Sequence, residues 1–174
     1  MIIDKAGYRL NVGIMLANKS GRLFWGKRIG HDSWQFPQGG LVSGETALEA
    51  MYRELYEEVG LSRTDVEVLG ETKRWLKYRL PSQYIRHEAV PVVIGQKQKW
   101  YLLRLLASEQ KIRLDLSDTP EFDSWRWIDA HDPGEQVIFF KKQVYTQALK
   151  ELESLLKKRR SLYGARRKRG NHSR

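Results

Sequence analysis

A run of residues between two glycine-containing turns, 39–61, constrains the fold of this chain more than any other feature. After a short loop it is rich in good helix formers, and it contains no further Gly or Pro before Gly60. This pattern predicts a helix over Ala47–Val59, whose start Thr46 or Ser43 would cap. Gly60 stands where a left-handed residue commonly ends a helix.

Three glutamates occupy one face of this predicted helix. At about 100° per residue, Glu57 lies roughly 300° and Glu58 roughly 40° around the axis from Glu54. Like charges at this spacing repel one another, and a divalent cation between them, Mg²⁺ above all, removes the repulsion. Taken alone, however, the acids are better interpreted as a solvated face in which Arg53 and Glu57 form an ordinary ion pair.

The spacing of the whole run favours the metal site over the solvated face. Nine positions resemble the complete Nudix box: Gly39-x5-Glu45-x7-Arg53-Glu54-Leu55-x-Glu57-Glu58-x-Gly60-Leu61. The resemblance implies a loop–helix–loop that holds Mg²⁺ or Mn²⁺ and a hydrolase for nucleoside diphosphates linked to another group. It implies that Glu54, Glu57 and Glu58 are metal ligands. It also implies that Arg53 orients a carboxylate and that Gly39, Glu45 and Gly60 support the box.

The composition indicates one globular domain with a basic end. The chain has 174 residues, of which 41% are hydrophobic and 30% charged. Residues 157–174 hold nine Lys or Arg and no acid, which leaves 22 basic and 21 acidic residues, a net charge of +1, in the rest. We expect a domain over residues 1–158 and a disordered basic tail over residues 159–174 that attracts polyanions without sequence selectivity.

Three absences narrow the class of protein further. There is no cysteine, no apolar run near 18 residues and no signal-peptide core at the N-terminus. Disulfides and thiolate metal sites are therefore excluded, and no membrane span is predicted. We expect a cytoplasmic protein.

Strand-like segments alternate with helical patterns along the chain. Apolar runs predict strands over residues 11–17, 23–27, 66–80, 100–107 and 125–128, with a short extended piece at 34–37. Apolar residues at helical spacing predict a last helix over about 133–159. Helices interleaved with strands indicate an α+β chain, with a mixed sheet between helical layers (α/β/α).

A second resemblance covers residues 7 to about 150. It rests on Gly7-Tyr8-Arg9-x-Asn11-Val12-Gly13, Trp34-Gln35-Phe36-Pro37-Gln38-Gly39-Gly40 and Gly95-Gln96-Lys97-Gln98-Lys99-Trp100. These segments are similar to the bacterial RNA pyrophosphohydrolases, also described as dinucleoside polyphosphate hydrolases. The resemblance implies removal of pyrophosphate or phosphate from the 5′ end of RNA, which leaves 5′-monophosphate RNA and initiates mRNA decay. It also implies that Glu121, by spacing alone an exposed loop acid, is a fourth metal-binding or base glutamate.

Basic residues beside apolar or aromatic ones are candidates for binding RNA. The predicted substrate-binding residues are Arg9, Arg28, Gln38, Gly39, Phe140 and Lys141. Arg28 and Phe140 would sandwich a base, since every base has a stacking face. Core packing on the last helix fits Phe140 equally well, and a solvated face fits Lys141.

The predicted catalytic residues are Glu54, Glu57, Glu121 and Arg53. Either Glu57 or Glu121 would be the base that deprotonates the attacking water. One alternative function is a dinucleoside polyphosphate hydrolase without a role on RNA. Another is a catalytically silent Nudix-fold RNA-binding module, although such a module has no need of mutually repelling acids. The nearly neutral body argues against a purely basic nucleic-acid-binding protein.

Overall fold

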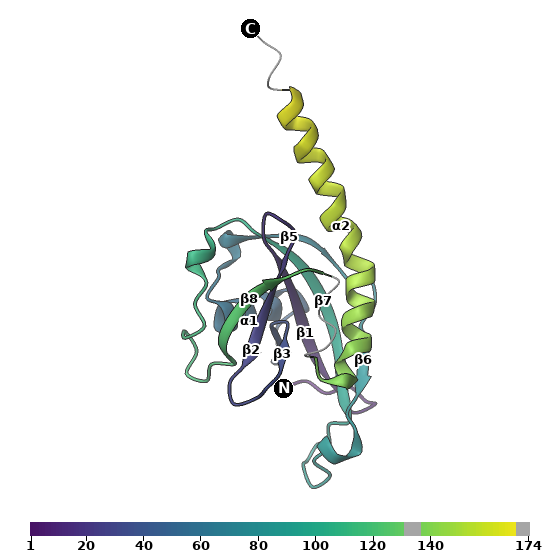
Figure 1. The fold of residues 1–174 in the computed structure, drawn as a ribbon. Coiled ribbons are helices and arrows are strands. Elements are labelled where there is room, and N and C mark those ends of the chain that lie inside the picture. The colour runs from purple at the N-terminus through teal and green to yellow at the C-terminus, as the bar shows by residue number, and fades with distance from the viewer. Residues whose placement is uncertain (131–136, 170–174) are drawn as a thin grey trace.

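One mixed sheet stands between two helices in the computed structural model of this chain (Figure 1). The backbone is described for residues 1–130 and 137–169, and the side chains up to residue 156. The helices are α1 (Ala47–Val59) and α2 (Lys142–Arg169). The strands are β1 (Tyr8–Ala17), β2 (Leu23–Arg28), β3 (Trp34–Gln35), β4 (Gln38–Gly40), β5 (Val66–Glu71), β6 (Leu76–Arg79), β7 (Gly95–Leu105) and β8 (Phe122–Ile128). The short 3₁₀ turns of the described residues are η1 (Arg63–Asp65), η2 (Ser82–Tyr84), η3 (Glu109–Lys111) and η4 (Phe139–Lys141).

Two parallel strands form the centre of the sheet. β1 and β7 pair from Tyr8 opposite Gly95 to Ala17 opposite Arg104, and the main order is β3-β2-β1-β7-β5. All other named pairings are antiparallel: β2 and β4 with β1, β5 and β6 with β7, and β3 and β8 with β2. The parallel pair therefore fixes the frame on which the shorter strands are placed.

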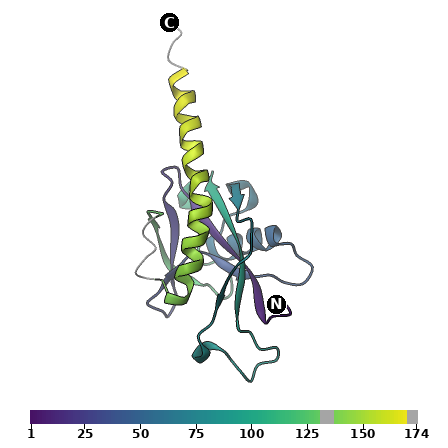
Figure 2. The ribbon, with the colours of Figure 1, turned by 90° about the vertical axis from the view of Figure 1, so that its right-hand side faces the viewer.

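Alternation along β1 divides the core into two layers. Ile14 and Leu16 pack in the cluster that contains the buried residues of α1. Met15 and Ala17 pack in the cluster that contains the buried residues of α2. Successive side chains of a strand point to opposite faces, so a strand buried on both faces reads as a continuous apolar run. The α/β/α arrangement predicted from the sequence is thereby confirmed (Figure 2).

The strand predicted over 66–80 is wrong in one respect, because it is interrupted. Glu71 stands opposite Tyr101 on β7, and Leu76 stands opposite Gln98, two residues later than a continuous antiparallel register would allow. The buried Thr72 makes the break: its N–H donates to the Trp100 carbonyl at 2.9 Å, and its Oγ1 accepts from the Trp100 N–H at 3.2 Å. Two strands, β5 and β6, therefore replace the single predicted strand.

The last helix begins later than predicted. Residues 131–136 lie outside the described part, and the Lys141 N–H donates to the Ile138 carbonyl at 2.9 Å to close η4 before α2 starts. The helix then continues to Arg169, into the stretch predicted to be a disordered tail. Figures 1 and 2 show the C-terminal part of α2 extending beyond the sheet. The domain boundary at residue 158 remains a prediction. Among the described residues, no helix is long and apolar enough to cross a bilayer.

Candidate active site

Helix α1 has the bounds predicted from the sequence, and its two ends are fixed by local hydrogen bonds. Thr46 is the N-cap: its Oγ1 accepts from the Glu49 N–H at 3.2 Å, and the Glu49 carboxylate accepts from the Thr46 N–H at 2.7 Å. This reciprocal capping box selects Thr46 over Ser43. Gly60 ends the helix with φ of 75°, and its N–H donates to the Tyr56 carbonyl at 2.9 Å.

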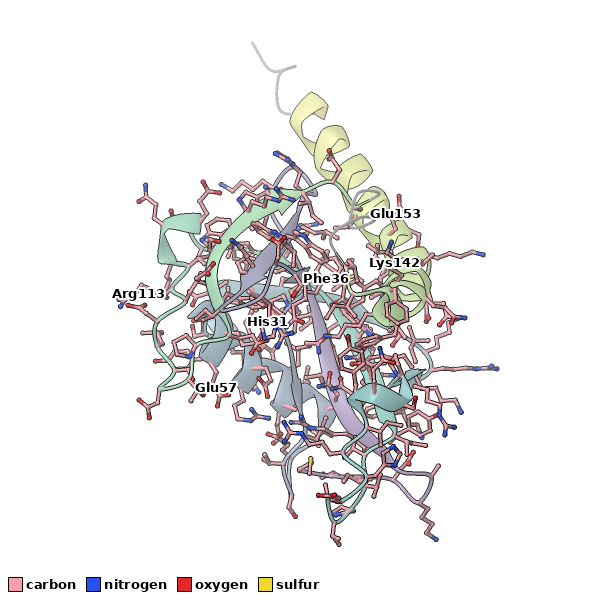
Figure 3. The ribbon with its side chains drawn as sticks, turned by 60° about the horizontal axis from the view of Figure 1, so that its bottom comes forward. His31, Phe36, Glu57, Arg113, Lys142 and Glu153 are labelled. Carbon is pink, nitrogen blue, oxygen red and sulfur yellow. The ribbon has the colours of Figure 1, made fainter. Side chains whose placement is uncertain are left out.

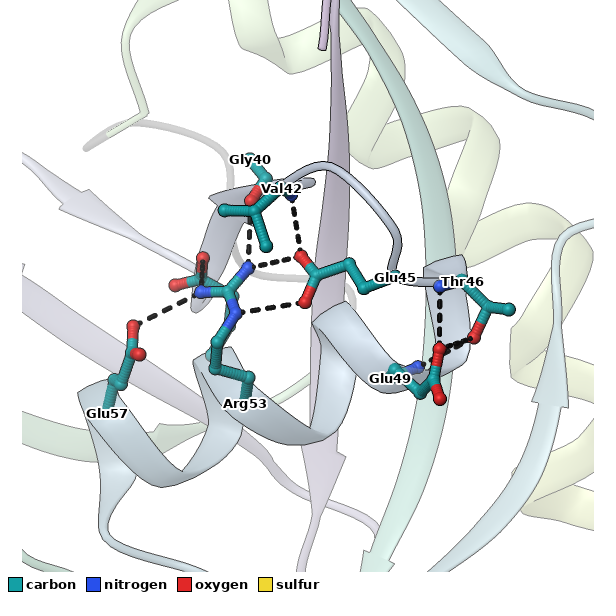
Figure 4. A network of polar contacts seen from close by, with 8 residues as sticks. Gly40, Val42, Glu45, Thr46, Glu49, Arg53 and Glu57 are labelled. Atoms are coloured by element: carbon teal, nitrogen blue, oxygen red, sulfur yellow. Dashed lines mark hydrogen bonds and ion pairs between the residues drawn. The ribbon is translucent and has the colours of Figure 1, made fainter. Parts of the chain in front are cut away.

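Arg53 is the centre of a polar network on this helix (Figure 4). Its Nε and Nη2 donate to the two oxygens of Glu45 at 3.1 and 2.7 Å, and Nη2 also donates to the Gly40 carbonyl at 2.9 Å. Its Nη1 donates to Glu54 at 2.6 Å and to Glu57 at 3.2 Å. A guanidinium presents donors in a planar fork, so one side chain ties the loop before the helix to two of its acids.

Glu45 completes this tie from the loop side. Its Oε1 accepts from the Val42 N–H at 2.8 Å, while both of its oxygens accept from Arg53. The hydrogen bond from Arg53 is the largest influence on the Glu45 carboxyl and lowers its pKa. The carboxylate therefore stays ionised and holds the loop against the helix, which is the structural role that the resemblance implies.

The acids of α1 are placed against the backbone of the preceding loop. Glu54 is buried, and its carboxylate lies over Gly39, where an added Cβ would be 1.8 Å from the carboxyl carbon. Glu58 accepts from the Gln38 N–H at 3.0 Å. Burial raises the pKa of Glu54 against the opposing effect of Arg53. Burial, with the neighbouring charge of Glu54, raises the pKa of Glu58 well above its usual value.

The fourth acid approaches from the segment before β8. Glu121 Oε1 accepts from Arg28 Nε at 2.8 Å and from Gln35 Nε2 at 3.1 Å. The oxygen of the Gln35 amide accepts in turn from Lys141 Nζ at 2.9 Å. The amide thus bridges an acid and a cation, because it both donates and accepts. Burial, with the nearby charge of Arg28, lowers the pKa of Lys141 to about 8.

These side chains surround one polar pocket of about 380 Å³. Its lining contains all four predicted metal-binding acids and five of the six predicted substrate-binding residues: Glu54, Glu57, Glu58, Glu121, Arg9, Arg28, Gln38, Gly39 and Lys141. The remaining lining residues are Asn11, Gln35, Gly40, Gln96, Ser117 and Thr119. Acids meet cations here, an arrangement suited to a ligand that carries both metal and phosphate.

The acids share the pocket, but each is held by a neighbour. Arg53 binds Glu54 and Glu57, the Gln38 N–H binds Glu58, and Arg28 and Gln35 bind Glu121. Within residues 1–130 and 137–156, no three His, Asp or Glu side chains are arranged as a ready metal site. A metal ion would therefore compete with these hydrogen bonds for the carboxylates.

Phe140 is the one predicted substrate-binding residue that lies outside the pocket lining, as do Arg53, Glu45 and Gly60 among the other predicted site residues. Its ring is half-buried and contacts Tyr78 and Tyr84, with centroids 5.5 and 5.6 Å apart. It also packs against the core cluster under α2, as the core interpretation of Phe140 expects.

Sequence reasoning missed three neutral amides of the lining: Asn11, Gln35 and Gln96. The Nε2 of Gln98 donates to the side-chain Oδ1 of Asn11 at 2.8 Å. These four amides lie inside the motifs that carry the second resemblance, and those motifs are the signal that could have identified them. A search for charged residues could not find them, because amides carry no charge.

The sequence matches the family described as NUDIX domain over residues 7–148. The RNA pyrophosphohydrolase of Legionella pneumophila (strain Corby) is 74% identical over 172 residues, which cover 98% of each chain. The RNA pyrophosphohydrolase of Edwardsiella ictaluri (strain 93-146) is 51% identical over 177 residues, which cover 97% of this chain and 100% of the relative.

Solved structures give the same answer for the fold. The E. coli dihydroneopterin triphosphate pyrophosphohydrolase superposes with a TM-score of 0.64 at 24% identity, covering 82% of this chain and 94% of that one. A C. elegans Ap4A hydrolase binary complex superposes with a TM-score of 0.58 at 16% identity, covering 90% and 98%. At such identities the likeness concerns the fold alone. The family match and the close relatives together establish that this chain belongs to the NUDIX domain family.

Proposed function

We propose that this protein is an RNA 5′-pyrophosphohydrolase, which converts 5′-triphosphate or 5′-diphosphate RNA to 5′-monophosphate RNA. The observation that carries the proposal is the pocket, in which four carboxylates face Arg9, Arg28 and Lys141. Phosphoanhydride cleavage needs both kinds of group, oxygen ligands for a metal ion and cations for phosphate charge. The relatives named RNA pyrophosphohydrolase, which match nearly the whole chain, support RNA as the substrate.

The acids fit a divalent metal ion by their chemistry. Hard cations bind carboxylate oxygens, and burial among like charges raises the pKa of Glu54 and Glu58. A cation among these groups would relieve that repulsion. We assign Glu54, Glu57, Glu58 and Glu121 as the residues that hold it. Mg²⁺ is the proposed ion and Mn²⁺ the alternative. When bound, such an ion neutralises anhydride oxygens and lowers the pKa of a water.

Substrate binding, positioning of the acids and proton transfer are assigned to residues of this chain. Lys141 and Arg28 bind phosphate or base in the pocket, and Gln35 holds Lys141 in place. Arg53 fixes the rotamers of Glu54 and Glu57 until substrate arrives. Glu57 or Glu121 accepts the proton of the attacking water, and the two remain equal candidates. The leaving pyrophosphate carries charge that Arg9 and Lys141 are placed to neutralise.

The test uses RNA with a labelled 5′-triphosphate, incubated with the protein and Mg²⁺. We expect labelled pyrophosphate, or phosphate released in successive steps, and no release when a chelator removes the ion. A dinucleoside tetraphosphate, assayed in parallel, tests the alternative substrate. Turnover of the dinucleotide without turnover of RNA would replace the proposal with that alternative. RNA binding without release from either substrate would indicate the silent binding module. We expect the protein to act in the cytoplasm.

A matched pair of variants assigns the activity to the pocket. Glu57→Gln removes one charge from the lining, and we expect turnover to fall by at least about 100-fold, the scale of a lost electrostatic group. Glu49→Gln makes the same chemical change on the same helix, outside the pocket, and Gln also serves in a capping box. Near-normal turnover by Glu57→Gln, with unchanged circular dichroism in both, would remove Glu57 from the site.

A further inference from the structure

Two exposed aromatic rings contact Phe140, the residue that precedes the pocket-lining Lys141. Tyr84, in η2, is 54% exposed, and Phe139, in η4, is 65% exposed. The ring of Phe140 stands between them, with centroid distances of 5.6 Å to Tyr84 and 5.4 Å to Phe139. We call Tyr84 and Phe139 the aromatic platform. Soluble proteins seldom leave neighbouring large rings open to water unless a partner covers them.

The platform is continuous with the pocket. Phe139 and Phe140 are followed directly by Lys141, whose ammonium group reaches the pocket lining. η4 also contacts β6, the strand that precedes the loop carrying Tyr84. The turn that carries Lys141 therefore also carries Phe139, and Phe140 links Phe139 to Tyr84.

The flanks of the platform are basic. Arg79 at the end of β6, Arg86 just after η2 and Lys142 at the start of α2 are all exposed, and Glu88 is the one acid in the segment 79–90. Lys142 is labelled at the start of the helix in Figure 3. Exposed rings flanked by cations are what single-stranded nucleic acid binds, since bases stack on the rings and phosphates pair with the cations.

We propose that the aromatic platform stacks the bases of the RNA nucleotides that follow those held in the pocket. This inference rests on the proposed function, because it assumes that the 5′ end of an RNA occupies the pocket. A protein partner would also cover exposed rings, but the basic flanks and the continuity with a phosphate-binding pocket favour RNA. The platform would make affinity depend on the length of the single-stranded 5′ end.

The test compares two substrates of different length, a 5′-triphosphorylated dinucleotide and a 5′-triphosphorylated single-stranded octanucleotide. For Tyr84→Ala and Phe139→Ala we expect KM for the octanucleotide to rise about tenfold, the scale of one lost base–ring stack, while kcat is unchanged. Both parameters for the dinucleotide should match those of the unmodified protein. Tyr84→Phe keeps the ring and should restore the octanucleotide KM.

Leu106→Ala is the matched control, because Leu106 is also exposed, at 55%, just beyond the far end of β7. Equal losses on both substrates would overturn the proposal, because the rings would then only support Phe140. An unchanged KM for both substrates would also overturn the proposal. If a variant with unchanged KM also altered self-association in sedimentation, the rings would instead form a protein contact.

A binding measurement separates failure of this inference from failure of the proposed function. The anisotropy of a 3′-labelled 5′-monophosphate octanucleotide reports affinity without hydrolysis. Weaker binding by Tyr84→Ala, with unchanged binding by Leu106→Ala, would support the platform even if no RNA were cleaved. No binding by the unmodified protein, or equal binding by every variant, would overturn it.

Discussion

Replacing Arg53 by Lys tests how the acid-bearing helix is held. The Arg53 guanidinium makes five hydrogen bonds to Glu45, Gly40, Glu54 and Glu57. An ammonium has three donors and no planar fork, so at least two of these bonds are lost. At roughly 1–1.5 kcal/mol each, the free energy of unfolding should fall by about 2–3 kcal/mol, towards the lower value because the side chain keeps some contact with water. Turnover should fall as well, because Glu54 and Glu57 lose their common anchor.

Arg113→Lys is the control for this change. Arg113 also makes a two-bond contact with a carboxylate, donating to Asp115 at 2.8 and 2.9 Å, but the two side chains are 58% and 68% exposed. Figure 3 shows Arg113 at the periphery of the molecule. Exposed ion pairs contribute little, so the control should unfold at nearly the same urea concentration as the unmodified protein. Equal destabilisation by the two substitutions would refute the reasoning, since the difference is attributed to the additional partners and burial of Arg53.

Two further perturbations follow from the structure. In Gly39→Ala the new Cβ would meet the Glu54 carboxylate. Because this carboxylate can rotate away, we expect a near-normal melting temperature, but turnover should be lost because Glu54 is displaced. Normal turnover would contradict the contact. The second perturbation is Asp65→Asn, measured as a function of pH. Asp65 is buried, and burial alone would raise the pKa of its carboxyl. Hydrogen bonds from Lys111 and Ser62 outweigh burial and lower the pKa below 3.8. Asp65 therefore stabilises the fold above about pH 4, and this contribution is lost as pH falls through its lowered value. The difference in unfolding free energy between the unmodified protein and Asp65→Asn should shrink between pH 6 and pH 3, and a constant difference would count against this ion pair.

The parts of the fold that were predictable are those encoded within a few residues. Helix α1 follows from its helix formers, the capping box at Thr46 and the left-handed Gly60, all local features. The two-sided burial of β1 and the apolar half of β7 were visible as continuous apolar runs. In the same way, the spacing of the box was sufficient to place Glu54, Glu57 and Glu58 in one pocket.

The parts that were missed depend on partners far away in the sequence. The polar half of β7, with Gln96 and Gln98, is a strand because it pairs with β1, whereas its sequence lacks the apolar run used to find strands. Thr72 interrupts its strand by bonding to Trp100, and no local signal announces that bond. Gln35 bridges an acid and a cation that are 86 and 106 residues away. Such roles are set by tertiary structure.

The start of α2 makes the pocket depend on a segment that contains none of the recognised motifs. Lys141 forms part of the pocket wall, and the helix that begins one residue later is anchored by Val144, Tyr145, Ala148 and Leu152 beneath the sheet. A shortened chain that ended before Val144 would retain all four carboxylates of the pocket lining, but the segment that carries Lys141 would lose the helix that anchors it. Sequence surveys that count only the glutamates would score such a truncated relative as intact, although it would lack an anchored Lys141 beside Arg9 and Arg28.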